Sequence, residues 1–393
     1  MDELADLATG LAKLRPPVEE LYLWQELRLD WELKEGEVRS LASRLRQACS
    51  LRRDGLLLCR DGCRREDVAF LLGLPTRKLP RFSWSPKITI PDPQVVSTQL
   101  AREDLRLSVA AAQVTVIRPD GVFSSARGPV FQAINSAGET FSWCENQPPP
   151  PTKTAQGGRK LPPSGKVKVL LRPQPSAVLI HEVFGHPLEG DSFFSGHSPW
   201  AGKLGSRVTT LPLTVQDNPT LMLPGSFLHD DEGEPARPKL LVEAGVLRGV
   251  LANRSIARFF PVKPGNARRA SPHHPPLPRI SNLVAWVEGG PQEPPLGEAN
   301  LEVVRVRSGV FLPKERSFLL SVSESYRLLR GTRAERLAPF YLKLPLGPNA
   351  LQLVAGGGQS EVVAEPGWCS KSGQRLPAGA LACWLLGAGV ELP

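Results

Sequence analysis

Proline limits what this chain can fold into more than any other residue type. Forty prolines are spread over 393 residues, and each lacks the amide hydrogen that an interior helical position needs, so regular helix is restricted. The densest run of prolines lies between Pro148 and Pro163 and includes a Gly-Gly pair. Because proline and glycine together preclude a packed element, this composition predicts a linker over residues 146–166.

Residues 1–75 are predicted to form a small N-terminal α+β domain. Apolar residues recur at helical spacing from Leu4 to Leu14, and the helix must stop at Pro16. The period then changes to an alternation of apolar and charged residues over 27–33, which is typical of a strand with one buried face. Turn signals follow, so we expect the strands of this domain to form an antiparallel sheet.

Two further regions complete the fold prediction, which is α+β overall. Residues 85–145 are predicted to form a middle α/β region, in which a helix-like segment precedes strands such as 114–117. Residues 167–393 are predicted to form a β-rich C-terminal domain. It opens with a strand over 167–171, and a helix that carries His181 follows.

Cysteine content and apolar runs indicate the cellular setting. The chain has six cysteines and they show no dense even framework, so we expect thiols in a reducing compartment. No apolar run approaches the roughly 18 residues that a membrane span needs. The acidic start Met1-Asp2-Glu3 is unlike a secretory signal. These features predict a cytoplasmic protein without a membrane partner.

The strongest chemical signal is the segment His181-Glu182-Val183-Phe184-Gly185-His186. Only six histidines occur in the whole chain, and two of them flank a glutamate on a predicted helix. Neutral imidazoles are good zinc ligands, and a bound cation lowers the pKa of water from about 15.7 toward about 7. Glu182 can take a proton from such a water and pass it to a leaving amine. The alternative is that both histidines have capping or core roles beside a surface glutamate.

The spacing between the two histidines predicts a distorted helix. Positions i and i+5 lie about 140° apart on a regular α-helix, so the two rings would not converge. Either the helix contains a π-bulge, whose natural period is i to i+5, or it ends between the two ligands. Gly185 permits an unusual backbone and Pro187 cannot donate a helical amide, so we expect the distortion at Gly185.

A zinc site also needs a third protein ligand and an open position for water. The residues by themselves offer several candidates, and sequence spacing does not decide among them. These candidates are Glu189, Asp191, His197, His229 and Cys369.

Several motifs together resemble the TldD/PmbA (modulator of DNA gyrase) family of metallopeptidases. They keep the family's order and span most of residues 167–393. The matching segments are 181–191 with the histidines, 229–235 with Asp-Asp-Glu-Gly, 265–269 with Gly-Asn-Ala-Arg-Arg, 278–282 with Pro-Arg-Ile-Ser-Asn, and 367–374 with Gly-Trp-Cys-Ser-Lys-Ser-Gly-Gln.

The resemblance implies a zinc-dependent peptidase whose metallopeptidase domain is 167–393. It implies one zinc ion per chain, with Cys369 as the third ligand beside His181 and His186, and Glu182 as the catalytic base. The alternative for Cys369 is a buried structural thiol. Arg268 and Arg269, in the Gly-Asn-Ala-Arg-Arg segment, could bind a peptide carboxylate, or they could pack the loop.

The resemblance also implies a substrate and a partner. The family is thought to cleave flexible peptides and unfolded segments inside a closed chamber. Its TldD-type catalytic subunits pair with a TldE/PmbA-type subunit that lacks the histidine motif. Because this chain has the motif, we expect a TldD-type subunit, in such a pair or in a homodimer. The chain is shorter than typical members in its amino-terminal and middle parts.

Two other hypotheses compete with a peptidase. One is a non-hydrolytic partner or scaffold that keeps the metal for structure, which a closed four-ligand site would support. The other is a DNA-associated modulator, which the net charge of +9 suggests and which predicts steeply salt-dependent binding. The arginines are scattered and no recognition motif accompanies them. We therefore expect a solvated basic surface and no nucleic-acid partner.

Overall fold

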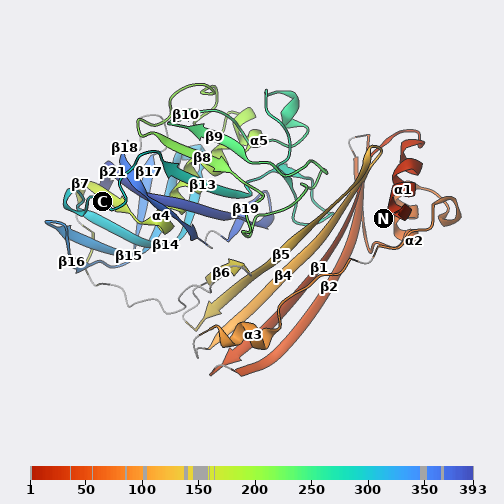
Figure 1. The fold of residues 1–393 in the computed structure, drawn as a ribbon, viewed down its shortest axis with the longest axis horizontal. Coiled ribbons are helices and arrows are strands. Elements are labelled where there is room, and N and C mark those ends of the chain that lie inside the picture. Colours follow the sequence, from red (N-terminus) through yellow and green to blue (C-terminus); the bar gives the residue numbers. More distant parts are fainter. Residues whose placement is uncertain are drawn as a thin grey trace.

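Two β-sheets carry most of the protein, as the computed structural model shows (Figure 1). The structure describes residues 2–35, 37–54, 56–84, 86–100, 104–136, 140–144, 158, 160–162, 164–345, 352–363 and 367–392. The predicted α+β class, with an antiparallel sheet in the N-terminal region, is confirmed.

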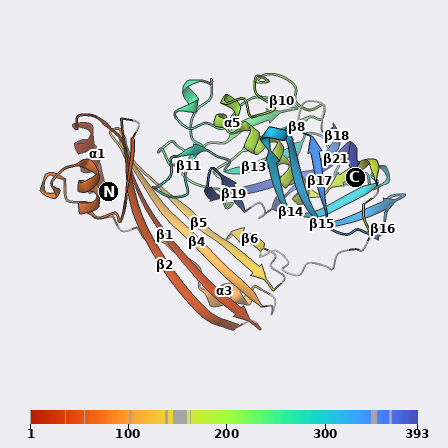
Figure 2. The ribbon, with the colours of Figure 1, turned by 180° about the vertical axis from the view of Figure 1, so that it is seen from behind.

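The first sheet, which we call the N-terminal sheet, is long and curved (Figures 1 and 2). Its six strands follow the order β3-β2-β1-β4-β5-β6, and all neighbours are antiparallel. The strands are β1 Val18–Lys34, β2 Glu37–Arg53, β3 Leu56–Asp61, β4 Leu105–Arg118, β5 Gly121–Asn135 and β6 Thr140–Cys144.

Three helices pack at the ends of this sheet. The predicted first helix is present as α1, Asp2–Ala12, and its buried Leu7 and Leu11 join one apolar core with α2, Arg65–Leu72. The helix α3, Pro93–Thr98, lies toward the other end (Figure 1). A 3-10 turn, η1, spans Thr76–Lys78.

The N-terminal sheet unites strands from both of the first two predicted regions. β1 belongs to residues 1–75 and β4 to residues 85–145, yet the two pair directly over Leu21–Leu33. The segment between them contributes α2 and α3 and returns the chain to the same sheet. The boundary placed between 75 and 85 therefore lies in a connection within one sheet.

The second sheet belongs to the C-terminal unit, residues 164–392 of the described chain, and has eleven strands. It is mixed, because β13 runs parallel to β21 and β14 runs parallel to β7. Its main path is β10-β9-β8-β13-β21-β7-β14-β15-β16. The strands are β7 Gly165–Leu171, β8 Leu213–Asp217, β9 Lys239–Glu243, β10 Val246–Leu247, β13 Asn282–Val287, β14 Leu301–Leu312, β15 Ser317–Leu329, β16 Thr332–Arg336, β17 Phe340–Pro345, β18 Gln352–Val363 and β21 Gly379–Leu392.

Two short hairpins and several short helices complete the C-terminal unit. One hairpin joins β11, Ala267–Arg268, to β12, Leu277–Pro278, and the other joins β19, Trp368–Lys371, to β20, Gln374–Pro377. The helices are α4 Pro173–Ile180 and α5 Gly190–Phe194, and the 3-10 turns outside the site are η4 Ile256–Arg258, η5 Leu296–Glu298 and η6 Pro313–Glu315.

The helix α4 lies buried in the core of the C-terminal unit. Residues 175–180 are all buried, so this short apolar helix packs on every side. It begins at Pro173, where the missing amide hydrogen costs nothing. The Ser176 hydroxyl donates to the carbonyl of Leu171.

A buried polar interface joins the N-terminal sheet to the C-terminal unit. The Tyr22 hydroxyl of β1 donates to Oδ1 of Asp231 at 3.0 Å. Nη2 of Arg269 lies 2.9 Å from Oε1 of Glu20, and Arg127 pairs with Asp231. Because these charges are buried and paired, the interface fixes the sheet against the C-terminal unit.

Most of the predicted linker over 146–166 lies outside the described residues. The last residues of this range belong to β7, which spans Gly165–Leu171. The predicted strand over 167–171 is therefore confirmed. Among the described helices, none has the length and apolar character needed to cross a membrane.

Candidate metal centre

The helix that carries His181 changes its hydrogen-bond period at that residue. After α4, His181–Gly185 form a π-helical turn, η2, and His186–Leu188 form a 3-10 turn, η3. The amide of His186 donates to the carbonyl of His181, which is an i to i+5 bond. This turn brings the two imidazoles together edge to face, with ring centroids 4.9 Å apart. The predicted distortion is therefore confirmed, and it is a π-turn.

Gly185 allows this turn to pack closely against the chain that leads into β13. A Cβ atom at position 185 would lie 2.7 Å from Cδ1 of Ile280 and 3.0 Å from Cδ1 of Leu283. Both neighbours are buried in the core. Glycine is needed here because of this close approach, since the backbone φ of −77° is available to any residue.

The third group to reach the two histidines is Cys369, on β19. Its Sγ lies 3.3 Å from Nε2 of His186. One ligand atom from each of His181, His186 and Cys369 lies within 4.8 Å of the others. The structure thus brings together the three residues that the sequence and the family resemblance had grouped.

The other four candidates for a third ligand have different surroundings. Glu189 is fully buried and accepts from Nζ of Lys371 at 2.8 Å, and Asp191 accepts from the same ammonium at 2.6 Å. Nδ1 of His197 contacts the Ser195 hydroxyl, and Nδ1 of His229 contacts the carbonyl of Ser124. None of these four belongs to the His-His-Cys group found among the described residues.

The three side chains suit a zinc ion by their chemistry and by their unfilled bonding capacity. Two imidazoles and one thiolate are a common zinc-binding set, and ligand atoms around tetrahedral zinc lie roughly 3.3–3.6 Å apart, given bond lengths of about 2.0–2.3 Å. Nδ1 of His181 is buried and has no hydrogen-bond partner among the described residues. A buried, unpartnered nitrogen costs stability unless something binds it, so this atom favours an ion here.

Electrostatics in the centre favour a thiolate. Burial raises the pKa of the Cys369 thiol, but His186 and His181 outweigh burial and hold this pKa well below its usual range. Burial lowers the pKa of His186, whereas Cys369 and Glu189 raise it, and the net pKa lies well above its ordinary value. Metal binding would therefore displace a proton from His186 and leave the sulfur already ionised.

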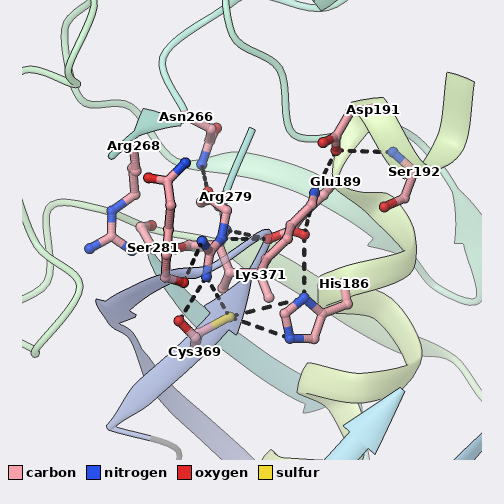
Figure 3. A network of polar contacts seen from close by, with 12 residues as sticks. His186, Glu189, Asp191, Ser192, Asn266, Arg268, Arg279, Ser281, Cys369 and Lys371 are labelled. Atoms are coloured by element: carbon pink, nitrogen blue, oxygen red, sulfur yellow. Dashed lines mark hydrogen bonds and ion pairs between the residues drawn. The ribbon is translucent and has the colours of Figure 1, made fainter. Parts of the chain in front are cut away.

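Behind the centre lies a buried network that sequence reasoning did not assign to the site (Figure 3). Nη2 of Arg279 lies 2.8 Å from the carbonyl oxygen of Cys369 and 3.1 Å from its Sγ. Its Nε lies 3.4 Å from Oε1 of Glu189. Glu189 in turn meets Nδ1 of His186 at 3.3 Å, which leaves Nε2 of that ring facing the sulfur. Such outer contacts orient metal ligands.

The charge of Glu189 is balanced within this network. Burial raises the pKa of its carboxyl, but Lys371, His186 and Arg279 outweigh burial and lower it. The only signal in the sequence for Arg279 was its place in the Pro-Arg-Ile-Ser-Asn segment, which carried no role. Its loop is held by Ser281 and Asn266, which both donate to Oδ2 of the buried Asp217 at 2.7 Å.

Arg268 and Arg269, the two candidates for binding a peptide carboxylate, are buried away from the cavity described next. Arg268 donates to the carbonyl of Pro377 at 2.7 Å and also to that of Ile280. Arg269 pairs with Glu20 and lies over the ring of Tyr22, at 3.5 Å from its centroid. These contacts favour the alternative, in which both arginines pack the loop.

A cavity of about 670 Å³ opens beside the centre. Glu182 lies on its wall, and Oε2 of this buried carboxyl has no hydrogen-bond partner among the described residues. Burial raises the pKa of the Glu182 carboxyl, although both neighbouring histidines lower it. The N-terminal sheet forms part of the opposite wall through Gln132, Thr140 and Ser142, and the C-terminal unit supplies the remaining lining, which includes Arg307–Phe311, Lys314, Trp368 and Arg375.

Comparison with known proteins finds sequence similarity to proteins named metalloproteases. Residues 164–339 match the family model described as the PmbA/TldA metallopeptidase C-terminal domain. A metalloprotease of Methanothermobacter thermautotrophicus is 31% identical over 231 residues, which cover 56% of this chain and 48% of that protein. A metalloprotease TldD homolog of Haemophilus influenzae is 32% identical over 232 residues, which cover 55% of this chain and 46% of that protein. The chain thus spans about half the length of these curated relatives.

The fold has a counterpart among solved structures over the whole chain. TldE from Thermococcus kodakarensis superposes with a TM-score of 0.69 and 13% sequence identity. The superposition covers 100% of this chain and 99% of that one. At this identity the likeness concerns the fold, and it includes the N-terminal sheet that the family model does not reach.

Proposed function

The chain belongs to the TldD/PmbA family, and we propose that it is a zinc-dependent peptidase of the TldD type that cleaves flexible or unfolded peptides. Relatives named metalloproteases and the His-His-Cys group support metal-dependent hydrolysis. The partly open cavity suits an extended chain better than a folded domain.

One observation carries the proposal. The ligand atoms of His181, His186 and Cys369 lie within 4.8 Å of one another, and these three residues line a cavity together with Glu182. Catalytic zinc sites use three protein ligands and keep one position open, whereas structural sites are closed by four. Three ligands beside a cavity therefore favour catalysis.

A zinc ion held by these three residues would supply Lewis acidity, which polarises a peptide carbonyl and lowers the pKa of water. Glu182 can do the proton transfer, because it lines the cavity and its Oε2 has no hydrogen-bond partner among the described residues. As general base it takes a proton from the attacking water, and as general acid it returns that proton to the amine when the C–N bond breaks. The backbone amide of Phe311 donates to Glu182 and fixes its orientation.

The alternative is a non-hydrolytic, metal-stabilised subunit of a TldD/PmbA-like complex. It would need a closed coordination shell, and Glu189, the acid that contacts His186, is instead engaged by Lys371 and Arg279. For assembly, we propose pairing with a TldE/PmbA-type subunit or with a second copy. The structural likeness to TldE supports this assembly.

Hydrolysis of casein, an unstructured protein, tests the function together with metal analysis. Wild-type protein should contain one zinc per chain and cleave casein. Glu182→Gln should retain the zinc and lose about 10²–10⁴-fold in rate. Undiminished cleavage by this variant would remove Glu182 from the mechanism, and metal-loaded wild type that cleaves nothing would favour the scaffold.

A further inference from the structure

We propose that the cavity beside the metal centre selects peptides that carry acidic side chains. This inference rests on the proposed peptidase function and names its substrate class. It follows from the balance of charged side chains on the cavity wall.

Cations outnumber acids among the described residues that line the cavity. The negative groups are the carboxylates of Glu182 and Glu189 and the thiolate of Cys369, and the lysines and arginines are Arg307, Lys314, Lys371 and Arg375. Lys371 and Glu189 neutralise each other through their contact at 2.8 Å. A zinc ion would add further positive charge. The potential in the cavity is therefore positive, and it attracts carboxylates.

Arg375 is placed and oriented for such a contact. It lies on β20 directly opposite Ser370, which follows the candidate ligand Cys369. Its guanidinium sits over the ring of Trp368, at 4.8 Å from the centroid. Stacking holds a guanidinium in one orientation and leaves its edge able to bind a carboxylate in a bidentate manner.

Lys314 approaches the cavity from a different element. It is exposed in η6, immediately after β14, whose residues 308–311 line the cavity near Glu182. The acid beside it, Glu315, is already paired with Nζ of Lys343 at 2.6 Å. The wall contributed by the N-terminal sheet is neutral, since it consists of Gln132, Thr140 and Ser142. An acidic peptide would thus meet cations on one side and uncharged polar groups on the other.

Binding of three labelled peptides tests the inference without relying on turnover. The peptides are unstructured and identical except for two positions, which are both Glu, both Gln or both Lys. Fluorescence anisotropy with zinc-loaded Glu182→Gln protein should show the Glu peptide binding about tenfold more tightly than the Gln peptide, and the Lys peptide most weakly. Added salt should reduce the difference.

Charge reversal assigns the preference to this cavity. In the same background, the double change Lys314→Glu and Arg375→Glu should abolish or invert the order of the three peptides. Arg237→Glu, an exposed arginine outside the cavity lining, should leave the order intact. Equal binding of the three peptides, or a preference that survives the double reversal, would overturn the inference. Cleavage of casein by wild type is scored separately, so a peptidase without acidic preference is distinguished from a protein that does not cleave.

Discussion

The two regions that meet at the cavity contribute to it in different ways. The C-terminal unit supplies buried and half-buried groups with dedicated partners, such as His186 held by Glu189 and Cys369 contacted by Arg279. The N-terminal sheet supplies Gln132 and its neighbours, which are uncharged and form only a wall. Metal binding and proton transfer thus depend on particular atoms that a buried network holds in place. The shape of the cavity on the other side depends only on where the N-terminal sheet lies.

This difference matches the extent of the family model, which covers residues 164–339. It covers the histidine turn and Arg279 but no strand of the N-terminal sheet. The sheet is nevertheless fixed in place by buried contacts such as Tyr22 with Asp231. We therefore expect changes in the C-terminal unit to alter metal binding and catalysis, and changes on the sheet to alter substrate binding alone.

Removal of the metal should have the largest effect. Dialysis against a chelator should reduce casein cleavage to background, because the Lewis acid is lost, and added zinc should restore it. Far-UV circular dichroism should show that the protein as a whole keeps its secondary structure. Cleavage that persists at full rate in metal-free protein would contradict the claim that the C-terminal unit supplies a metal-dependent catalytic centre.

Glu189→Gln should weaken zinc binding by about 10–100-fold, because an amide orients His186 less well and no longer balances Lys371 and Arg279. Competition with a chromophoric chelator measures the change. Glu302→Gln is the matched control: Glu302 is equally buried in the C-terminal unit but pairs with Arg172 and Arg333. Equal losses of zinc affinity in both variants would mean that Glu189 acts only through stability.

Gly185→Ala should lower the free energy of unfolding by about 1–3 kcal/mol, because its Cβ would meet Ile280 at 2.7 Å in a packed core. Denaturant titration provides the measurement. Gly10→Ala in α1 is the control from the other region, since nothing lies within 4 Å of its added Cβ. Alanine there should raise the free energy of unfolding by about 0.5–1 kcal/mol. A change in the free energy of unfolding with the same sign for both variants would contradict the packing argument.

Gln132→Ala should have the smallest effect, a change in KM of roughly threefold or less, as expected for the loss of one uncharged hydrogen bond. Steady-state kinetics and zinc content should be measured together. Unchanged zinc content with a small change in KM would support the view that the N-terminal sheet affects substrate binding alone. A loss of zinc would show that the N-terminal sheet supports the centre directly.

The sequence predicted those parts of the site that depend on neighbouring residues. The i to i+5 spacing of His181 and His186 predicted a distorted helix, because the rotation per residue of a helix is known. Cys369, which is 183 residues from His186, was one of five candidates for the third ligand, and only the family resemblance selected it. Arg279 received no role, because contact with Cys369 across 90 residues follows from tertiary packing. Likewise, the alternation of apolar and charged residues predicted strands of the N-terminal sheet. It did not predict that β1 pairs with β4, which follows only after α2 and α3 in the chain.

The central claim is that His181, His186 and Cys369 bind one metal ion together. X-ray absorption spectroscopy at the zinc edge tests it most directly, in wild-type protein and in Cys369→Ala. The account predicts one zinc per chain with nitrogen ligands and one sulfur at about 2.3 Å, and a spectrum without sulfur, or loss of zinc, in the variant. Full zinc content with no sulfur ligand in the wild type would contradict it.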